Sequence, residues 1–250
     1  MLDQLLPGLI RNIGFTVLYY LVVVLVFWAL WLWWRRHPPA RKRLQARLVS
    51  APQIQREMLW TISTLVVAGS VLPILLTFGF GKYTQFYPNV AKFGWAYFVL
   101  SIVLMMLVQD TYFYWSHRLM HRPRLFRWFH RTHHKSVNTN PWTTYAVGPL
   151  EALGVNGVTI IILLLIPVNG LALLIFSLIN TAYAVYTHLG YELYPRGTAS
   201  HWLGRWINTS VAHNTHHARN RYNYGWYFLF WDRAMGTLDP DYAARFRAAR

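Results

Sequence analysis

The sequence alternates between long apolar segments and short basic ones. Residues Phe15 to Trp34 carry no charge, and similar uncharged apolar segments lie at 59–80 and 93–108. A helix of about 20 apolar residues matches the hydrocarbon thickness of a bilayer. A longer apolar segment, Ala152 to Tyr186, is interrupted at 167–170 by Pro-Val-Asn-Gly, which is typical of a turn. The pattern predicts five membrane-spanning helices, and a hairpin that enters and leaves on one side is the alternative for the last two.

The basic residues are distributed unevenly around these segments. Loop 35–56 contains seven Lys or Arg, segment 110–150 contains six and segment 189–250 contains eight, whereas the connections on the other side contain three. Basic residues collect on the cytoplasmic side of membrane proteins. The first span ends in Arg35-Arg36 rather than in a cleavage site, which indicates a retained anchor. The predicted location is therefore an integral, multi-pass one, in a bacterial inner membrane.

Composition narrows the class of protein further. The chain is 55% hydrophobic, has no cysteine and has a formal net charge of +16. Disulfides, iron–sulfur clusters and thiolate-ligated haem are thereby excluded. Because the basic residues flank the spans instead of forming one stripe, the charge indicates membrane orientation and contact with anionic headgroups, not nucleic-acid binding. The predicted fold class is an all-α integral membrane protein of about four to five transmembrane helices with a cytoplasmic helical cap.

Three histidine clusters lie in the regions predicted to face the cytoplasm. The clusters contain eight of the eleven histidines: His117 and His121; His130, His133 and His134; His213, His216 and His217. Residues three or four apart share one side of a helix, and imidazole is the commonest metal ligand in proteins. Eight imidazoles exceed the needs of one ion, so the pattern predicts two metals with about four ligands each. A lone histidine such as His37 is better explained as a hydrogen-bonded surface residue.

One carboxylate lies close to the first cluster in the sequence. Asp110 stands seven residues before His117, at the end of the third apolar segment. A charged carboxylate so close to the hydrocarbon core of a membrane costs free energy, so its presence there indicates a function. It is predicted to accept the free ring N–H of a ligating histidine; the alternative is a wetted residue at the membrane edge. The sequence contains no Glu-x-x-His, no His-Glu-x-x-His and no glycine-rich phosphate loop, which argues against soluble carboxylate-bridged di-iron sites, zinc proteases and nucleotide binding.

From about Asp110 to Thr237 the chain resembles the fatty acid hydroxylase/sterol desaturase superfamily of membrane-bound, histidine-rich di-iron oxygenases. The matching motifs are the three histidine clusters, Asn140-Pro141-Trp142, Pro149-Leu150-Glu151, Tyr222-Asn223-Tyr224-Gly225, Trp231-Asp232-Arg233 and Gly236-Thr237. The tail is most similar to C-5 sterol desaturases, although related bacterial members act on other lipids. Gly148 stands where many relatives have a histidine, which puts the substrate in question more than the metal site.

The resemblance implies a ligand set, cofactors and a division of the chain. All eight clustered histidines would be metal ligands, His188 after the fifth span would be a ninth, and His201 is a weaker candidate. Two iron ions would use O2 to hydroxylate or desaturate a C–H bond of a sterol-like or fatty-acyl lipid. Residues 110–250 would form the catalytic domain and 1–109 the N-terminal transmembrane helices and basic loop, as one functional unit.

The chain contains no flavin, haem or iron–sulfur module, so the resemblance also implies an external electron donor. A separate electron-transfer protein of the ferredoxin or cytochrome b5 type would suit a basic cytoplasmic face. Two other functions stay open. A membrane dinuclear metal hydrolase would need an acid–base group near the metals, from among Asp110, Glu151, Glu192 and Asp232. A metal transporter would place its ligands near the bilayer midplane, whereas these clusters lie outside the predicted spans.

Overall fold

The computed structural model of the chain describes residues 2–37, 43–45 and 47–249. Arg41, Lys42 and Arg250, which contribute to the charge asymmetry, lie outside the described residues. The α-helices in the described part are α1 (Leu2–Arg36), α2 (Ala51–Thr77), α3 (Gly94–Met120), α4 (Pro123–Phe129), α5 (Arg131–His134), α6 (Pro149–Leu165), α7 (Gly170–Thr187), α8 (Ser210–Arg219), α9 (Phe230–Ala234) and α10 (Tyr242–Ala248). Short 3-10 helices connect them: η1 (Phe80–Tyr83), η2 (Val90–Lys92), η3 (Pro141–Tyr145), η4 (Thr198–Ser200) and η5 (Gly204–Trp206).

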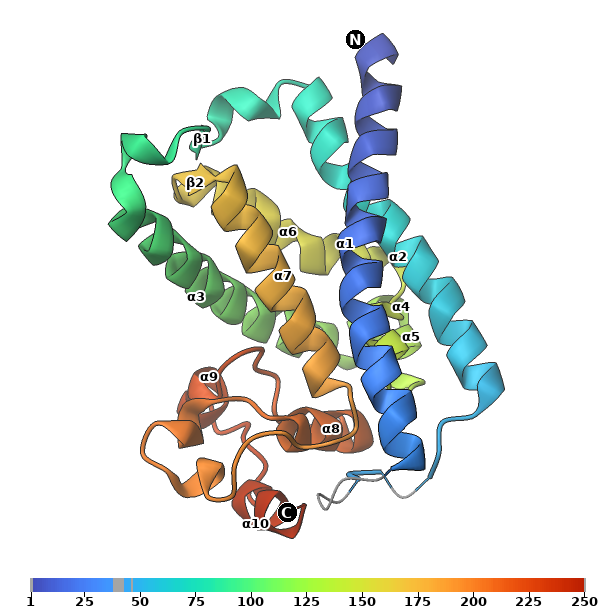
Figure 1. The fold of residues 1–250 in the computed structure, drawn as a ribbon. Coiled ribbons are helices and arrows are strands. Elements are labelled where there is room, and N and C mark those ends of the chain that lie inside the picture. Colours follow the sequence, from blue (N-terminus) through green and yellow to red (C-terminus); the bar gives the residue numbers. More distant parts are fainter. Residues whose placement is uncertain (1, 38–42, 46, 250) are drawn as a thin grey trace.

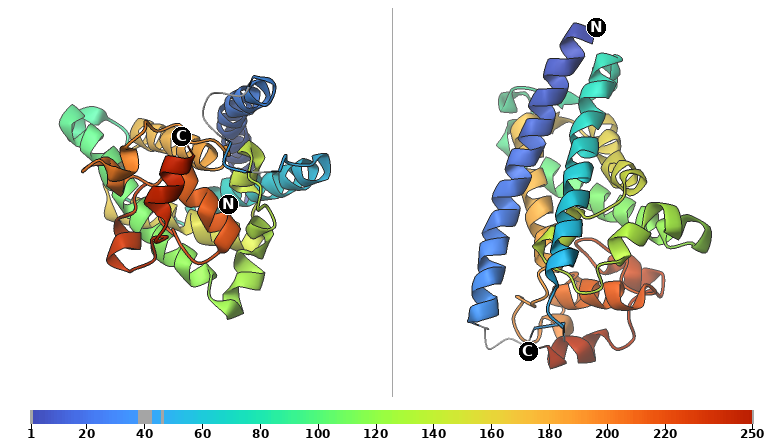
Figure 2. Two further views of the ribbon diagram at one scale, coloured as in Figure 1. Left: turned by 90° about the horizontal axis from the view of Figure 1, so that it is seen from below. Right: turned by 90° about the vertical axis from the view of Figure 1, so that its right-hand side faces the viewer.

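The long helices form a bundle with a helical cap at one end. Helices α1 and α2 run antiparallel side by side, and α3, α6 and α7 pack beside them (Figures 1 and 2). The cap consists of α8, α9 and α10 at the end opposite the N-terminus (Figure 1). Four helices are long and apolar enough to cross a membrane: Leu5–Arg36, Ala51–Thr77, Gly94–Met120 and Gly170–Thr187. The predicted all-α, multi-pass membrane fold is confirmed.

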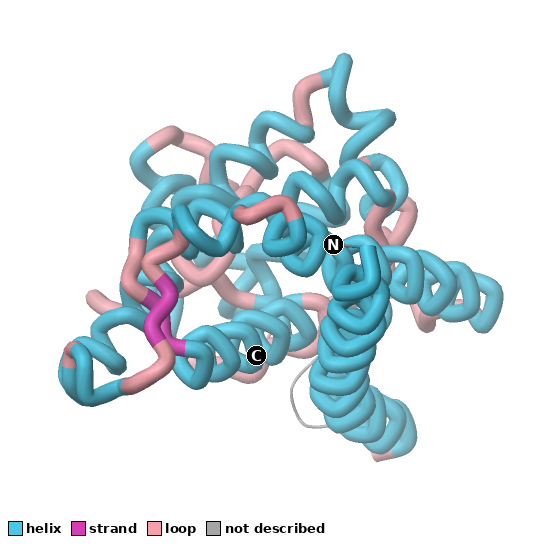
Figure 3. Tube along the Cα trace, turned by 90° about the horizontal axis from the view of Figure 1, so that it is seen from above, coloured by secondary structure: helices cyan, strands magenta, loops and turns pink. Residues whose placement is uncertain are grey.

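The fourth predicted span corresponds to the short apolar helix α6, and the fifth to α7. The 17 residues of α6 fall below the length of about 20 that a perpendicular crossing needs. Strand β1 (Phe86–Tyr87) pairs in parallel with β2 (Val168–Asn169), which joins the α2–α3 connection to the α6–α7 turn. Both connections therefore lie at the end opposite the cap, with the strand pair at the edge of the bundle (Figures 1 and 3). Because the α6–α7 turn pairs with the α2–α3 connection at the end opposite the cap, the arrangement favours five crossings over a shallow hairpin.

Single cysteines can test this topology because the chain has none of its own. We expect Gly170→Cys at the α6–α7 turn and Lys82→Cys in η1 to react with a membrane-impermeant maleimide from the same side. Arg196→Cys, after α7, should react only from the other side. All three positions are exposed. The measurement is labelling in sealed vesicles of known orientation; a Gly170→Cys variant that labels only together with Arg196→Cys would contradict five crossings.

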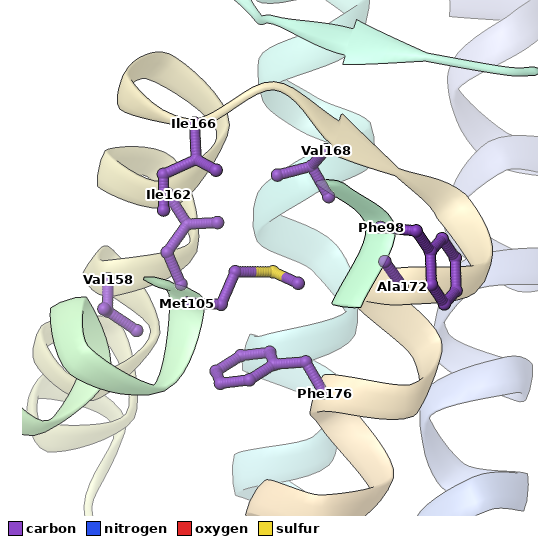
Figure 4. Packing of buried hydrophobic residues seen from close by; sticks show 8 residues of the cluster. All are labelled: Phe98, Met105, Val158, Ile162, Ile166, Val168, Ala172 and Phe176. Carbon is purple, nitrogen blue, oxygen red and sulfur yellow. The ribbon is translucent and has the colours of Figure 1, made fainter. Parts of the chain in front are cut away.

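The largest apolar cluster lies between α3, α6 and α7. Figure 4 shows its eight buried members: Phe98, Met105, Val158, Ile162, Ile166, Val168, Ala172 and Phe176. Small residues elsewhere permit close helix contact, as is common among membrane helices. A Cβ added at Gly69 on α2 would lie 2.7 Å from the Cα of Ile13 on α1. A larger residue there would force these two helices apart.

A buried carboxylate attaches α2 to the connection after the second histidine cluster. Glu57 is fully buried and accepts hydrogen bonds from Asn140 Nδ2 (2.5 Å), Thr143 Oγ1 (3.1 Å) and Gln53 Nε2 (2.8 Å). Asn140 also caps η3 by accepting from the backbone N–H of Trp142. A buried carboxylate needs such donors to offset the loss of water. The Asn-Pro-Trp motif therefore fixes η3 against α2, next to the histidines.

Candidate metal centre

The cap and the adjoining helix ends bring nine histidines together in two groups. The five-histidine group consists of His117, His121, His130, His134 and His216, and the four-histidine group of His133, His188, His213 and His217. Within each group the potential ligand nitrogens lie within 4.8 Å of one another. His121 is half-buried and the other eight are buried, whereas His37 and His201 are exposed and belong to neither group.

Each His-x-x-His-His motif is divided between the two groups. On α5 and the residue before it, His130 and His134 join the five-histidine group while His133 joins the other. On α8 the division is reversed, because His213 and His217 share the four-histidine group and His216 joins the five. Residues four apart lie on one side of a helix, and the residue between them points elsewhere. The short helices α5 and α8 therefore connect both groups.

The ring contacts inside both groups are made through Nε2 atoms. In the five-histidine group, Nε2 of His117 lies 2.9 Å from Nε2 of His130, and the corresponding His134–His216 distance is 3.1 Å. In the four-histidine group, Nε2 of His188 lies 3.3 Å from that of His133, 3.0 Å from that of His213 and 3.2 Å from that of His217. The Nε2 of His121 is buried without a hydrogen-bond partner among the described residues.

Four of the histidines are oriented by acceptors for their other ring nitrogen. Nδ1–H of His117 donates to the carbonyl of Tyr224 (3.0 Å), and that of His216 to the carbonyl of Tyr222 (2.7 Å). His188 donates in the same way to the carbonyl of Ala184 (2.7 Å). His130 Nδ1 lies 2.5 Å from Oε1 of buried Glu151. A proton held on Nδ1 leaves the Nε2 lone pair directed inward, which is the tautomer a metal ligand requires.

Burial keeps these rings neutral. Loss of water lowers the pKa of His133, His213, His216 and His217 well below the ordinary value, and neighbouring histidines lower it further. Burial lowers the pKa of His188 to about 4. Neutral rings with Nε2 lone pairs facing each other at about 3 Å repel, and a cation between them removes the repulsion. The nitrogen donors present thus fit two transition-metal ions, whose identity imidazole alone does not select.

The tail motifs hold the loop that supplies two of the carbonyl acceptors. Asp232 accepts from the backbone N–H groups of Tyr224 and Gly225 and from Thr237 Oγ1, each at 2.8 Å. A Cβ at Gly225 would lie 2.2 Å from the carbonyl oxygen of Phe228, so a larger residue does not fit. The Trp-Asp-Arg and Gly-Thr motifs therefore keep the Tyr-Asn-Tyr-Gly loop in place behind the histidines.

The expected contact between Asp110 and a histidine is absent from the described part of the chain. Asp110 instead accepts from the backbone N–H groups of Tyr227 (2.7 Å) and Phe228 (2.9 Å). Asp110 lies about 10 Å before His117 along α3, and its carboxylate is bound by the loop after Trp226 instead of by a ring. The predicted contact is wrong. The carboxylate that does contact a ring is Glu151, which the sequence singled out only as one of four acidic groups.

Glu192 anchors the helix that carries the third cluster. It accepts from the backbone N–H of Val211 (3.1 Å), the backbone N–H of Tyr194 (2.9 Å) and the hydroxyl of Tyr186 (2.6 Å). A carboxylate is favourable at a helix N-terminus, here that of α8. Of the four acidic groups that a hydrolase would need to draw on, Asp110, Glu192 and Asp232 bind backbone N–H groups, which leaves little support for that alternative.

A largely apolar cavity lies beside both groups. Its wall includes His117 and His130 from the five-histidine group, and His133, His188 and His213 from the four-histidine group. The remaining wall comes from α2, α3, η3 and α6 and from Trp226. A molecule in this cavity would contact both groups of histidines at once.

The fold and the histidine groups together define a multi-pass membrane protein with a candidate dinuclear metal centre. Residues 102–237, more than half of the chain, match the fatty acid hydroxylase family. The chain belongs to this family, and the resemblance inferred from the motifs is confirmed.

Curated relatives include enzymes named for sterols. A Delta(7)-sterol 5(6)-desaturase of Gibberella zeae is 28% identical over 63% of this chain and 50% of its own length. The lathosterol oxidase of Rattus norvegicus is 24% identical over 92% of this chain and 73% of its own length. The rat cholesterol 25-hydroxylase is 28% identical over 55% of this chain and 46% of its own length. The chain thus spans about half the length of the first of these relatives. No solved structure matches the chain.

Proposed function

We propose that the chain is an O2-dependent membrane oxidoreductase that hydroxylates or desaturates a C–H bond of a lipid. The observation that carries the proposal is the convergence of nine histidines in two groups beside one apolar cavity. The five-histidine and four-histidine groups would each hold one iron ion. Membership of the fatty acid hydroxylase family and relatives named as desaturase, oxidase and hydroxylase support it.

The described residues have separate tasks in this reaction. When bound, a pair of iron ions supplies the redox chemistry with O2 that an unactivated C–H bond requires. The Nε2 atoms would hold the ions, while Glu151 and the carbonyls of Tyr222, Tyr224 and Ala184 keep the Nδ1 protons in place. The apolar cavity wall excludes water and holds the substrate carbon near both groups.

The same proposal includes a location and an electron source. We place the site on the cytoplasmic face, in a bacterial inner membrane, because the basic segments flank it. A separate electron-transfer protein of the ferredoxin or cytochrome b5 type would supply electrons. Residues 110–250 form the catalytic part, and the preceding helices complete it, since α2 contributes to the cavity wall through Thr64. A sterol-like or fatty-acyl lipid is the proposed substrate.

Lipid mass spectrometry tests the proposed activity. Membranes from cells producing the wild-type chain, with a ferredoxin or cytochrome b5 system and candidate sterols supplied, should contain a lipid absent from cells producing His133→Ala. Gain of one oxygen would identify a hydroxylase, and loss of two hydrogens a desaturase. The His37→Ala variant, altered at an exposed histidine, should behave as wild type. Identical lipids in wild type and His133→Ala, at equal protein levels and with reduced donor present, would contradict the proposal.

A further inference from the structure

A second cavity lies between α2 and α6, next to the cavity beside the histidines. Asn156 of α6 contributes to the wall of both. Its side-chain amide donates to the carbonyl of Ala152 at 2.7 Å, so it is bound back to its own helix. The second cavity extends along α6 from Asn156 to Leu163, away from the cap. The two neighbouring cavities, joined at Asn156, are here named the α2–α6 groove.

One side of α2 forms the first wall of this groove. Thr64 belongs to the cavity at the histidines, and Ala68, Val71, Leu72 and Leu75 belong to its continuation. Relative to Thr64 they stand four, seven, eight and eleven residues further along, which places all five on a single face of the helix. The last four are only half-buried, which is the exposure expected of an open groove rather than of a closed helix contact.

Helix α6 forms the second wall and has two different sides. The groove side carries Ala152, Val155, Thr159 and Leu163. The side toward α3 is closely packed, because a Cβ at Gly157 would lie 2.7 Å from the hydroxyl of Tyr112. The glycine thus permits tight contact with α3, while the cavity beside α6 lies on its side toward α2.

We propose that the α2–α6 groove binds the aliphatic chain of the lipid substrate and directs it to the histidines. This inference rests on the proposed function. The continuation past Asn156 is lined by no charged residue. It lies between a candidate membrane span and an apolar helix, so an aliphatic chain can enter without crossing water. From Ala152 to Leu163 the groove follows α6 for about 16 Å, a length suited to an extended chain and not to a compact headgroup.

Photolabelling tests the proposal through binding. The probes are octadecanoic acid with a mid-chain diazirine and cholesterol with a side-chain diazirine, applied to purified protein in lipid nanodiscs. We expect one or both to label segments 64–75 and 152–163, with competition by the unlabelled compound. Labelling by the acid alone identifies a free acyl chain as the occupant, and labelling by the cholesterol probe a sterol side chain.

Two substitutions into the groove and one outside it make the test specific. Ala68→Trp fills the groove, and Thr159→Phe narrows it from the other wall; both should abolish the competed labelling. Val66→Trp, on the exposed side of α2, should leave it unchanged. The proposal is refuted if the unlabelled compound does not reduce the labelling. It is also refuted if competed labelling survives in both groove variants while they are folded. Because binding is read without turnover, competed labelling in a protein that oxidises no lipid would refute only the proposed function.

Discussion

Replacing His216 with alanine is expected to remove metal from the five-histidine group and to abolish lipid oxidation. The ring is fully buried, its Nε2 lies 3.1 Å from that of His134, and its Nδ1–H donates to the carbonyl of Tyr222. Altering a group that merely orients a ligand reduces metal affinity by about 10–100-fold, so loss of a ligand itself should cost at least as much. Metal per polypeptide, measured by elemental mass spectrometry, should fall by about one equivalent.

His201→Ala is the matched control for this loss. His201 is exposed and belongs to neither histidine group, so the variant should keep its metal and its activity. His216 lies on α8 outside the membrane spans, and membrane insertion of His216→Ala should therefore equal that of the wild type. Full metal content and full turnover in His216→Ala would be incompatible with the assigned ligand.

The long helices could be predicted from the sequence because each needs only an unbroken apolar segment. Helix α3 extends beyond the apolar segment that ends at Val108 and continues to Met120, so the first histidine cluster lies at its C-terminal end. Whether α6 spans the membrane was harder to predict, because Pro149 starts the helix and the turn at 167–170 limits it to 17 residues. Whether a helix of that length crosses depends on its neighbours, which a local pattern does not contain.

The membership of the histidine groups could not be predicted from spacing. Along the chain the clusters contain two, three and three histidines, but in space they divide into five and four. A helix fixes the angle between His213 and His216 but not which partner each faces, because that depends on how α5 and α8 pack. The resemblance pointed to His188, and the structure places it in the four-histidine group, where its Nε2 contacts three others.

The polar contacts around the histidines were predicted least well, because they join distant segments. Asp110 was expected to contact a ring and binds the loop at Tyr227 instead. Glu151 lies 21 residues after His130, and the two meet only because α6 packs beside α4, whose C-cap is His130. Neither contact produces a periodic pattern in the sequence from which it could be predicted. The proline before Glu151 marks a helix start, but not the direction in which the carboxylate points.

Replacing Glu151 is expected to weaken metal binding by the five-histidine group alone. Glu151→Ala removes both the acceptor and the charge beside Nδ1 of His130, and affinity should fall by about 10–100-fold. Glu151→Gln keeps an acceptor oxygen without the charge, so this variant should lose less metal affinity than Glu151→Ala. The four-histidine group should be unaffected, because its oriented ring, His188, donates to the carbonyl of Ala184. Competition with a chelator, followed separately for the two metal equivalents, measures the difference.

The charge of Glu151 explains why the effect should be confined to one group. Within the described residues it is the carboxylate that hydrogen-bonds a histidine of either group. A buried dication surrounded by neutral imidazoles gains from a nearby negative charge. Glu57→Gln is the control, since this buried carboxylate binds Asn140 and Thr143 and should alter stability while metal affinity stays the same. Equal weakening of both metal equivalents by Glu151→Ala would show that the carboxylate supports the cap as a whole and not His130.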